Sequence, residues 1–114
     1  MGTVRILRVY EEPESGEYRV LVDRLWPRGI EKDTIDLWLK EIAPSTEVRN
    51  AFGHLPEHFS TFERDYTAEL KGNPALQQLR GIIDSHTRVA LLYGAKDPAQ
   101  NQAAVLLDFL NSAA

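Results

Sequence analysis

Five consecutive apolar residues at positions 89–93 (VALLY) constrain the fold of this chain more than any other feature. An apolar run of strand length without polar alternation is typical of a central strand that is covered on both faces. Gly94 ends the run, and helix-like patterns lie on both sides of it. We therefore expect a single α/β domain in which helices pack on a small sheet, mixed or mostly parallel, with a helix-rich middle.

Two further strands are expected at residues 3–10 and 18–23, which are rich in Val, Ile and Leu. The polar turn between them is too short for a parallel crossover, so these strands would be antiparallel if they paired with each other. The pattern leaves open whether they do. The much longer connection to residues 89–93 allows the second and third strands to be parallel.

The remaining segments predict helices. Ser45 is a candidate N-cap and Gly53 a candidate helix end. A capping residue followed by proline begins a helix at Asn73 and again at Asp97. Apolar residues at three- and four-residue spacing support the longer helices. The expected helices are 34–42, 45–53, 56–72, one that starts at 73, and 97–111.

Composition narrows the function classes. The 114 residues suit one domain, and the absence of cysteine excludes disulfides, thiolate metal sites and a cysteine nucleophile. No apolar run approaches the roughly 20 residues that span a bilayer. The net charge of −4 disfavours a nucleic-acid binder, which usually carries a basic surplus. We expect a cytoplasmic protein without membrane association, and its oligomeric state stays open.

Polar and aromatic residues follow two of the expected strands, where open α/β sheets bind their ligands. If the second and third strands are parallel neighbours, their carboxyl ends meet at one edge of the sheet. The residues that this argument brings together are Asp23, Arg24, Trp26, Arg28, Tyr93, Lys96 and Asn101. The sequence therefore predicts a ligand site at this edge.

The chemistry of this edge suits an anion. Arg24 and Arg28 offer planar groups that bind carboxylate or phosphate with paired hydrogen bonds, and Lys96 adds a compact positive charge. The helix expected after Asp97 directs its free N–H groups to the same region. Trp26 and Tyr93 offer flat surfaces for a ring.

Asp23 is the candidate catalytic acid or base, or a carboxylate that holds the arginines in place. Trp38, Arg49, His54 and Asp97 are additional candidates for the site. Structural roles compete with each of these assignments. Asp97 suits a helix cap, both tryptophans suit the core, and Arg24 suits an internal ion pair.

Residues 54–58 spell H-x-x-E-H, a zinc-peptidase pattern. That chemistry needs both histidines on one helical face, but Gly53 and Pro56 place His54 before the helix begins. We therefore expect no metal. His54 remains a candidate general base or a solvated residue at a helix end. The chain has no G-x-G-x-x-G, P-loop or G-x-S-x-G motif, so no cofactor is expected.

Residues 19–29 (RVLVDRLWPRG) strongly resemble the signature of the YeaO-like family. The resemblance continues through residues 38–45 (WLKEIAPS), 91–97 (LLYGAKD), 101–103 and 105–106, so that it covers nearly the whole chain. It implies a compact cytoplasmic protein of bacteria or archaea, from a family of unknown function without an established activity.

Two functions follow from these observations. The first is a small-molecule site for a carboxylate- or phosphate-bearing ligand, such as a nucleotide, at the carboxyl ends of the strands. The alternative is a non-catalytic module that binds a protein or a nucleic acid through an exposed patch. The sequence does not decide whether the protein is an enzyme.

Overall fold

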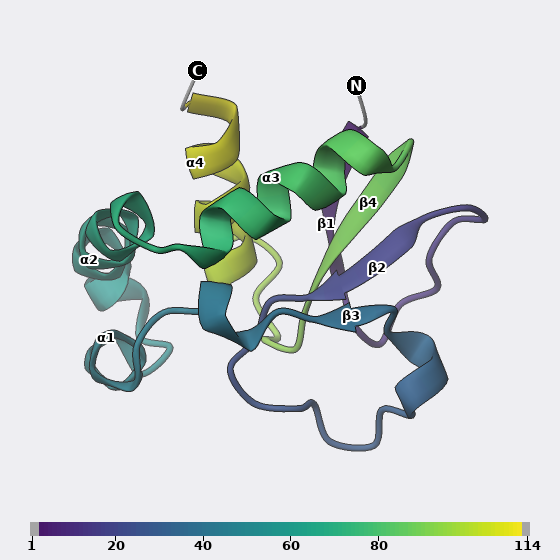
Figure 1. The fold of residues 1–114 in the computed structure, drawn as a ribbon. Coiled ribbons are helices and arrows are strands. Elements are labelled where there is room, and N and C mark those ends of the chain that lie inside the picture. The colour runs from purple at the N-terminus through teal and green to yellow at the C-terminus, as the bar shows by residue number, and fades with distance from the viewer. Residues whose placement is uncertain (1–2, 113–114) are drawn as a thin grey trace.

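The sheet has four parallel strands in the order β1-β4-β2-β3. A computed structural model describes residues 3–112 (Figure 1). The strands are β1 (Thr3–Arg8), β2 (Tyr18–Leu21), β3 (Leu37–Trp38) and β4 (Arg88–Tyr93). The helices are α1 (Thr46–Phe52), α2 (Phe59–Lys71), α3 (Ala75–Ser85) and α4 (Gln102–Ser112). The expected α/β class is confirmed, and the sheet is parallel throughout.

The apolar run at residues 89–93 forms β4, a central strand. It pairs with β1 on one side and with β2 on the other. Its side chains alternate between the two faces of the sheet, and residues 89–93 are all buried. Continuous apolar sequence is what a strand covered on both faces requires.

The first two strands are not neighbours, because β4 lies between them. Residues 9–17 carry the chain back from the end of β1 to the start of β2 without a helix. The antiparallel pairing considered above for directly paired strands therefore does not arise. The parallel arrangement of β2 and β4 is confirmed.

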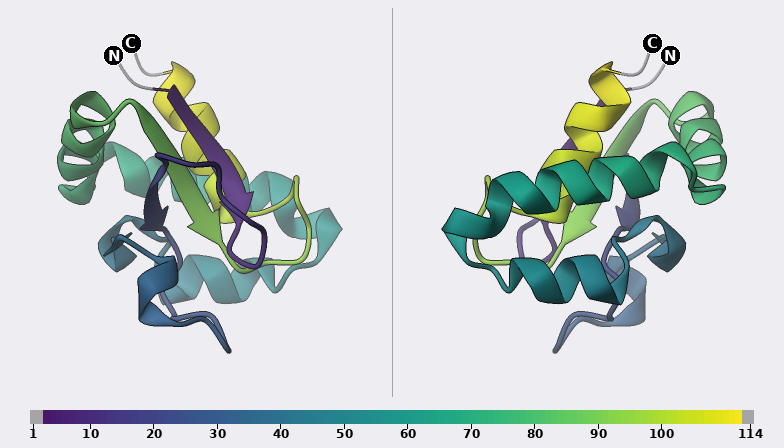
Figure 2. Two further views of the ribbon diagram at one scale, coloured as in Figure 1. Left: turned by 90° about the vertical axis from the view of Figure 1, so that its right-hand side faces the viewer. Right: turned by 90° about the vertical axis from the view of Figure 1, so that its left-hand side faces the viewer.

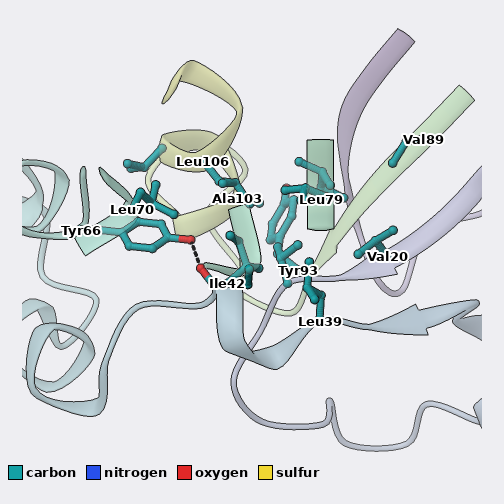
Figure 3. Close-up of a cluster of buried hydrophobic side chains, with 14 of the residues drawn as sticks. Val20, Leu39, Ile42, Tyr66, Leu70, Leu79, Val89, Tyr93, Ala103 and Leu106 are labelled. Carbon is teal, nitrogen blue, oxygen red and sulfur yellow. Dashed lines mark hydrogen bonds between the residues drawn. The ribbon is translucent and has the colours of Figure 1, made fainter. Parts of the chain in front are cut away.

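All four α-helices pack on one face of the sheet (Figure 2). Figure 2 shows α1 and α2 behind the sheet in its left view and in front of it in its right view. The helices bury Phe62, Tyr66 and Leu70 of α2, Leu79 of α3 and Leu106 of α4 against the sheet (Figure 3). The Tyr66 hydroxyl donates a 2.6 Å hydrogen bond to the Ile42 carbonyl inside this core.

The opposite face of the sheet is covered by an irregular segment instead of a helix. Trp26, Ile30, Ile35 and Trp38 pack there against the second buried cluster, which includes Leu7, Val9, Leu21, Ala90 and Leu92. The two indole rings meet edge to face with centroids 5.4 Å apart. Each indole N–H donates to a main-chain carbonyl, Trp26 to Ile30 at 2.8 Å and Trp38 to Asp23 at 2.7 Å.

The helix expected at residues 34–42 is wrong. This segment contains two single turns of 3₁₀ helix, η1 (Lys32–Thr34) and η2 (Lys40–Ile42), on either side of the short strand β3. Asp36 explains the preference for a strand, because its carboxylate accepts hydrogen bonds from the main chain and side chain of Arg19 next to β2. Thr34, Ile35 and Trp38 are also weaker helix formers than straight-chain residues.

The helix boundaries at 45–53 and 73 are confirmed. The Ser45 hydroxyl accepts a hydrogen bond from Val48 N–H at 3.2 Å, and Gly53 ends α1 in the left-handed conformation at φ 55°. Pro56 opens a 3₁₀ turn, η3 (Pro56–His58), that leads directly into α2. Asn73 accepts a hydrogen bond from Ala75 N–H at the start of α3.

The last helix begins later than the pattern at Asp97 predicts. Asp97 caps a turn, in which its carboxylate accepts hydrogen bonds from the N–H groups of Ala99 and Gln100. Asn101 is the actual N-cap of α4, since its side-chain oxygen accepts from Ala104 N–H at 2.8 Å. No helix within residues 3–112 has the length and apolar character needed to cross a membrane.

Candidate functional site

A cavity of about 230 Å³ lies where β2 and β4 end. Residues from the loops that follow these two strands line it, and α1 contributes Arg49 and Phe52. Asp23 and Arg24 come from the first loop, and Gly94 and Ala95 come from the second. The remaining lining residues are Leu25, Ala43, Pro44, Arg49, Phe52, His54, Phe62 and Gln102. The two polar loops thus share one cavity, as the parallel arrangement of their strands requires.

Asp23 is held rigidly at the base of this cavity. One carboxylate oxygen accepts a 2.8 Å hydrogen bond from Gly94 N–H, and the other accepts one from the Gln102 side-chain amide. Burial raises the pKa of the Asp23 carboxyl to about 6, although the Gly94 N–H and the positive charge of Arg49 act in the opposite direction. A carboxyl with this pKa exchanges its proton near neutral pH, as a general acid or base must.

This contact leaves little room for a side chain at position 94. A Cβ at position 94 would lie only 3.1 Å from the Asp23 carboxylate oxygen that the Gly94 N–H now binds. The bare backbone therefore lets the loop after β4 approach the end of β2 closely.

Arg24 is anchored to main-chain carbonyls on the cavity wall. Its Nε donates to the Pro44 carbonyl at 3.0 Å and one terminal nitrogen donates to the Ala43 carbonyl at 3.2 Å. These bonds use two of its five N–H donors and leave its charge without a carboxylate partner among residues 3–112. Arg24 thus supplies a fixed positive charge with unused donors.

Arg49 is the most unusual group at the cavity. It lies on α1, and its Nε is buried without a hydrogen-bond partner. Within the described chain its guanidinium forms no ion pair, with Asp23 or with any other carboxylate. A buried N–H group without a partner costs about 1–3 kcal/mol, so its presence beside a cavity is a sign of a functional role.

His54 joins this cavity to a second one of about 400 Å³. The second cavity also contains Lys96, Asp97 and Gln100, and the two share Phe52, His54, Gly94 and Ala95. His54 has a left-handed backbone with φ 59°, directly after Gly53. A left-handed non-glycine residue costs about 1–2 kcal/mol, and such residues are concentrated at functional sites.

Hydrogen bonds from the N–H groups of Gln100 and Ala99 lower the pKa of the Asp97 carboxyl. This carboxylate therefore stays ionised at the outer end of the second cavity, near the exposed Lys96. The second cavity, called the outer cavity below, thus carries both signs of charge, from Lys96 and Asp97. The first cavity, called the inner cavity below, has the guanidinium groups of Arg24 and Arg49 and the carboxylate of Asp23.

Five of the candidate residues lie away from these cavities. Trp26 and Trp38 line a separate groove on the other face of the sheet, together with Ile30 and Ile35. Arg28 is exposed and lines none of the three. Tyr93 is only 3% exposed and belongs to the helix-side core (Figure 3), and Asn101 is fully buried as the cap of α4. Arg24, Arg49, Asp23 and His54 are the candidates that the structure brings to the inner cavity.

Gln102 is a site residue that the sequence argument did not select, although it adjoins Asn101 at the expected helix start. It is the first residue of α4, and its amide binds the Asp23 carboxylate. The helix start placed at Asp97 assigned the site to Asn101, one position earlier. Recognising Asn101 as the cap would have placed Gln102 in the first turn, facing the loop after β2. No group of three or more His, Asp or Glu side chains within residues 3–112 is arranged to hold a metal ion.

Known proteins resemble this chain over almost its whole length. The uncharacterized protein YeaO of Escherichia coli (strain K12) is 44% identical over 112 residues, which cover 96% of this chain and 97% of that protein. The uncharacterized protein Rv3073c of Mycobacterium tuberculosis (strain ATCC 25618 / H37Rv) is 42% identical and covers 95% of this chain and 93% of its own. No solved structure matches.

A family model described as the inactive DUF488-N3 subclade matches residues 3–114. The resemblance to the YeaO-like family is confirmed by the identity to YeaO itself. The chain therefore belongs to the DUF488-N3i family, together with its YeaO-like relatives.

Proposed function

We propose that this protein binds a small molecule that carries a phosphate or carboxylate group, in the cavity at the carboxyl ends of β2 and β4. The observation that carries the proposal is Arg49, whose buried Nε has no partner and whose charge is unpaired at the cavity wall. Arg24 and His54 add donors on the same cavity. An anion would satisfy these groups together.

The size of the cavity sets the size of the buried group. About 230 Å³ corresponds to the volume of roughly seven to eight water molecules, at about 30 Å³ each. This volume holds a phosphate or carboxylate head with a few further atoms. The adjoining cavity of about 400 Å³ leaves room for a larger polar part of the ligand, near Lys96 and Gln100.

Binding without chemical turnover is the simplest form of this function. The family is described as an inactive subclade. Asp23 lies in the cavity with an acid–base pKa, but both of its oxygens are already held by Gly94 and Gln102. We therefore propose that Asp23 takes part in ligand recognition and not in catalysis.

Thermal shift with a panel of nucleotides, phosphorylated metabolites and small carboxylates tests the proposal. A ligand at about 100 times its Kd adds about 2.7 kcal/mol to the free energy of unfolding. For 114 residues this raises Tm by about 10 °C. Arg49→Gln is expected to abolish the shift, and its own Tm should not fall, since it removes a buried N–H group that has no hydrogen-bond partner.

Two control variants locate the site. Arg64→Gln changes an exposed arginine of α2 that pairs with its neighbour Asp65, so it should keep the full shift. Arg28→Gln changes the exposed arginine outside the cavities. A ligand lost on Arg28→Gln but kept on Arg49→Gln would refute this cavity and favour the loop at residues 26–29. A panel without any shift would refute the function.

A further inference from the structure

We propose that the cavity selects an oxyanion that still carries a proton, such as hydrogen phosphate or a singly protonated phosphate monoester, and discriminates against sulfate. This inference rests on the proposed function and specifies its ligand. Its basis is a carboxylate, Asp23, that lies in the same small cavity as two unpaired guanidinium groups. In a site that recognised negative charge alone, a carboxylate would weaken binding of the anion.

Asp23 is fixed and has spare acceptor capacity. Among residues 3–112 it is the one carboxylate that lines the inner cavity. Gly94 N–H holds one oxygen and the Gln102 amide holds the other. An ionised carboxylate has about four acceptor positions, so about two remain for a donor inside the cavity.

The space between Asp23 and Arg49 can hold a group that both contact. The two side chains line one cavity, yet they form no ion pair within residues 3–112. An anion bound by Arg49 and Arg24 would therefore lie against the Asp23 carboxylate. An ionised oxygen of the anion would repel an ionised Asp23 oxygen that it touches. If the anion carries an O–H group there, that group instead donates a short, strong hydrogen bond to Asp23.

The proton decides which anions fit. Hydrogen phosphate brings its own proton and donates it to Asp23. Sulfate has none near neutral pH, so the proton must come from solvent and be placed on the Asp23 carboxyl, whose pKa is about 6. At about pH 7.5 that requirement weakens sulfate binding roughly 30-fold, and at about pH 5 it disappears.

Other charged groups around Asp23 act on both anions. Arg24 lines the cavity from the loop after β2, and Arg49 lines it from α1. His54 lines it from the turn that follows α1. A positive charge on His54 would strengthen phosphate and sulfate binding alike. The Tyr66 hydroxyl beneath the site stays neutral, because burial raises its pKa. The ratio of the two affinities is therefore insensitive to these groups, and it reports the effect of Asp23 together with the charge that phosphate itself loses at the lower pH.

The experiment compares inorganic phosphate with sulfate by thermal-shift titration at about pH 7.5 and about pH 5, with chloride keeping the ionic strength constant. The wild-type protein should prefer phosphate by about 30-fold at the higher pH and lose most of that preference at the lower pH. Methyl phosphate, a third probe, distinguishes a monoester head group from free phosphate.

Asp23→Asn is the decisive variant. Its amide can still accept a hydrogen bond from Gly94 N–H and can donate one to either anion, so the preference for phosphate should fall to within about 2-fold at about pH 7.5. Phosphate itself loses negative charge at the lower pH, which changes its affinity independently of Asp23. The change in the affinity ratio of Asp23→Asn between the two pH values measures this contribution. Arg64→Gln should behave as the wild type does.

Equal affinity of the wild type for phosphate and sulfate at about pH 7.5 would overturn the inference, and so would a preference that survives in Asp23→Asn. If that variant does not fold, the wild-type pH series decides, because a ratio that is the same at both pH values contradicts a shared proton. Failure of the whole anion panel to bind refutes the proposed function. Binding of both anions without preference refutes only this inference.

Discussion

Tyr66→Phe should destabilise the fold by about 2 kcal/mol, although it removes a single oxygen atom. The Tyr66 side chain is fully buried, and its hydroxyl donates to the Ile42 carbonyl at 2.6 Å. Without this donor the carbonyl stays buried and unpaired at the end of η2, which costs about 1–3 kcal/mol. The ring itself is retained, so no large cavity adds to the loss.

The matched control is Tyr10→Phe, the same chemical change at the surface. Tyr10 is 48% exposed, and its hydroxyl donates to the Arg28 carbonyl at 2.9 Å. Water replaces that donor, so the free energy of unfolding should change by less than about 0.5 kcal/mol. For 114 residues, 2 kcal/mol corresponds to a fall in Tm of about 8 °C.

Thermal and urea unfolding of the two variants and the wild type measure the difference. Losses of similar size in Tyr66→Phe and Tyr10→Phe would refute the reasoning, since they would mean that burial of the Ile42 carbonyl has no energetic consequence. The result also bears on the site. The chain after Ile42 supplies the carbonyls of Ala43 and Pro44 that hold Arg24, so Tyr66→Phe should also weaken ligand binding.

Two further outcomes are expected. Asn101→Ala should lower the free energy of unfolding in urea by about 1–2 kcal/mol, because Ala104 N–H loses its cap, whereas Asp97→Ala should cost clearly less; the opposite order would restore Asp97 as the helix start. Asp23→Asn should change the pH dependence of stability. Burial raises the folded pKa of Asp23 from 3.8 to about 6, so the folded protein binds this proton more tightly than the unfolded chain does. The unfolding free energy of the wild type should therefore fall by roughly 2 kcal/mol, relative to Asp23→Asn, as pH rises from about 4 to about 6, and parallel profiles would contradict this.

Local patterns predicted most of the fold. The run at residues 89–93 led to a buried central strand, and the cap at Ser45 and the glycine at position 53 placed α1 correctly. The failures have tertiary causes. Residues 34–42 carry a pattern that suits a helix, but Leu37 and Trp38 extend the sheet because Arg19 and β2 bind the chain there. Arg19 is 17 residues away from Asp36 in the sequence, so a pattern read over a short stretch of residues does not include it.

The site was predicted in part, and for a definable reason. The sequence placed Asp23 and Arg24 at the end of β2 and opposite the loop after β4, because parallel strands end at the same edge. It did not show on which side of the sheet a loop residue would lie. Trp26 and Trp38 follow the chain to the far face, where they cover Leu21 and Leu92. Arg49 comes from a helix whose orientation depends on packing, so its contact with the cavity could be raised only as an alternative.

The position of β4 between β1 and β2 has a consequence for how the chain folds. β1 has no strand partner in the first three quarters of the sequence, because the segment that pairs with it is Arg88–Tyr93. During synthesis the backbone N–H and C=O groups of β1 therefore have no strand partner until residues 88–93 have been made. β4 then pairs with β1 and β2 in one step. The domain should therefore acquire its structure cooperatively only after residues 88–93 have been synthesised, and a chain that stops before residue 88 should remain unfolded.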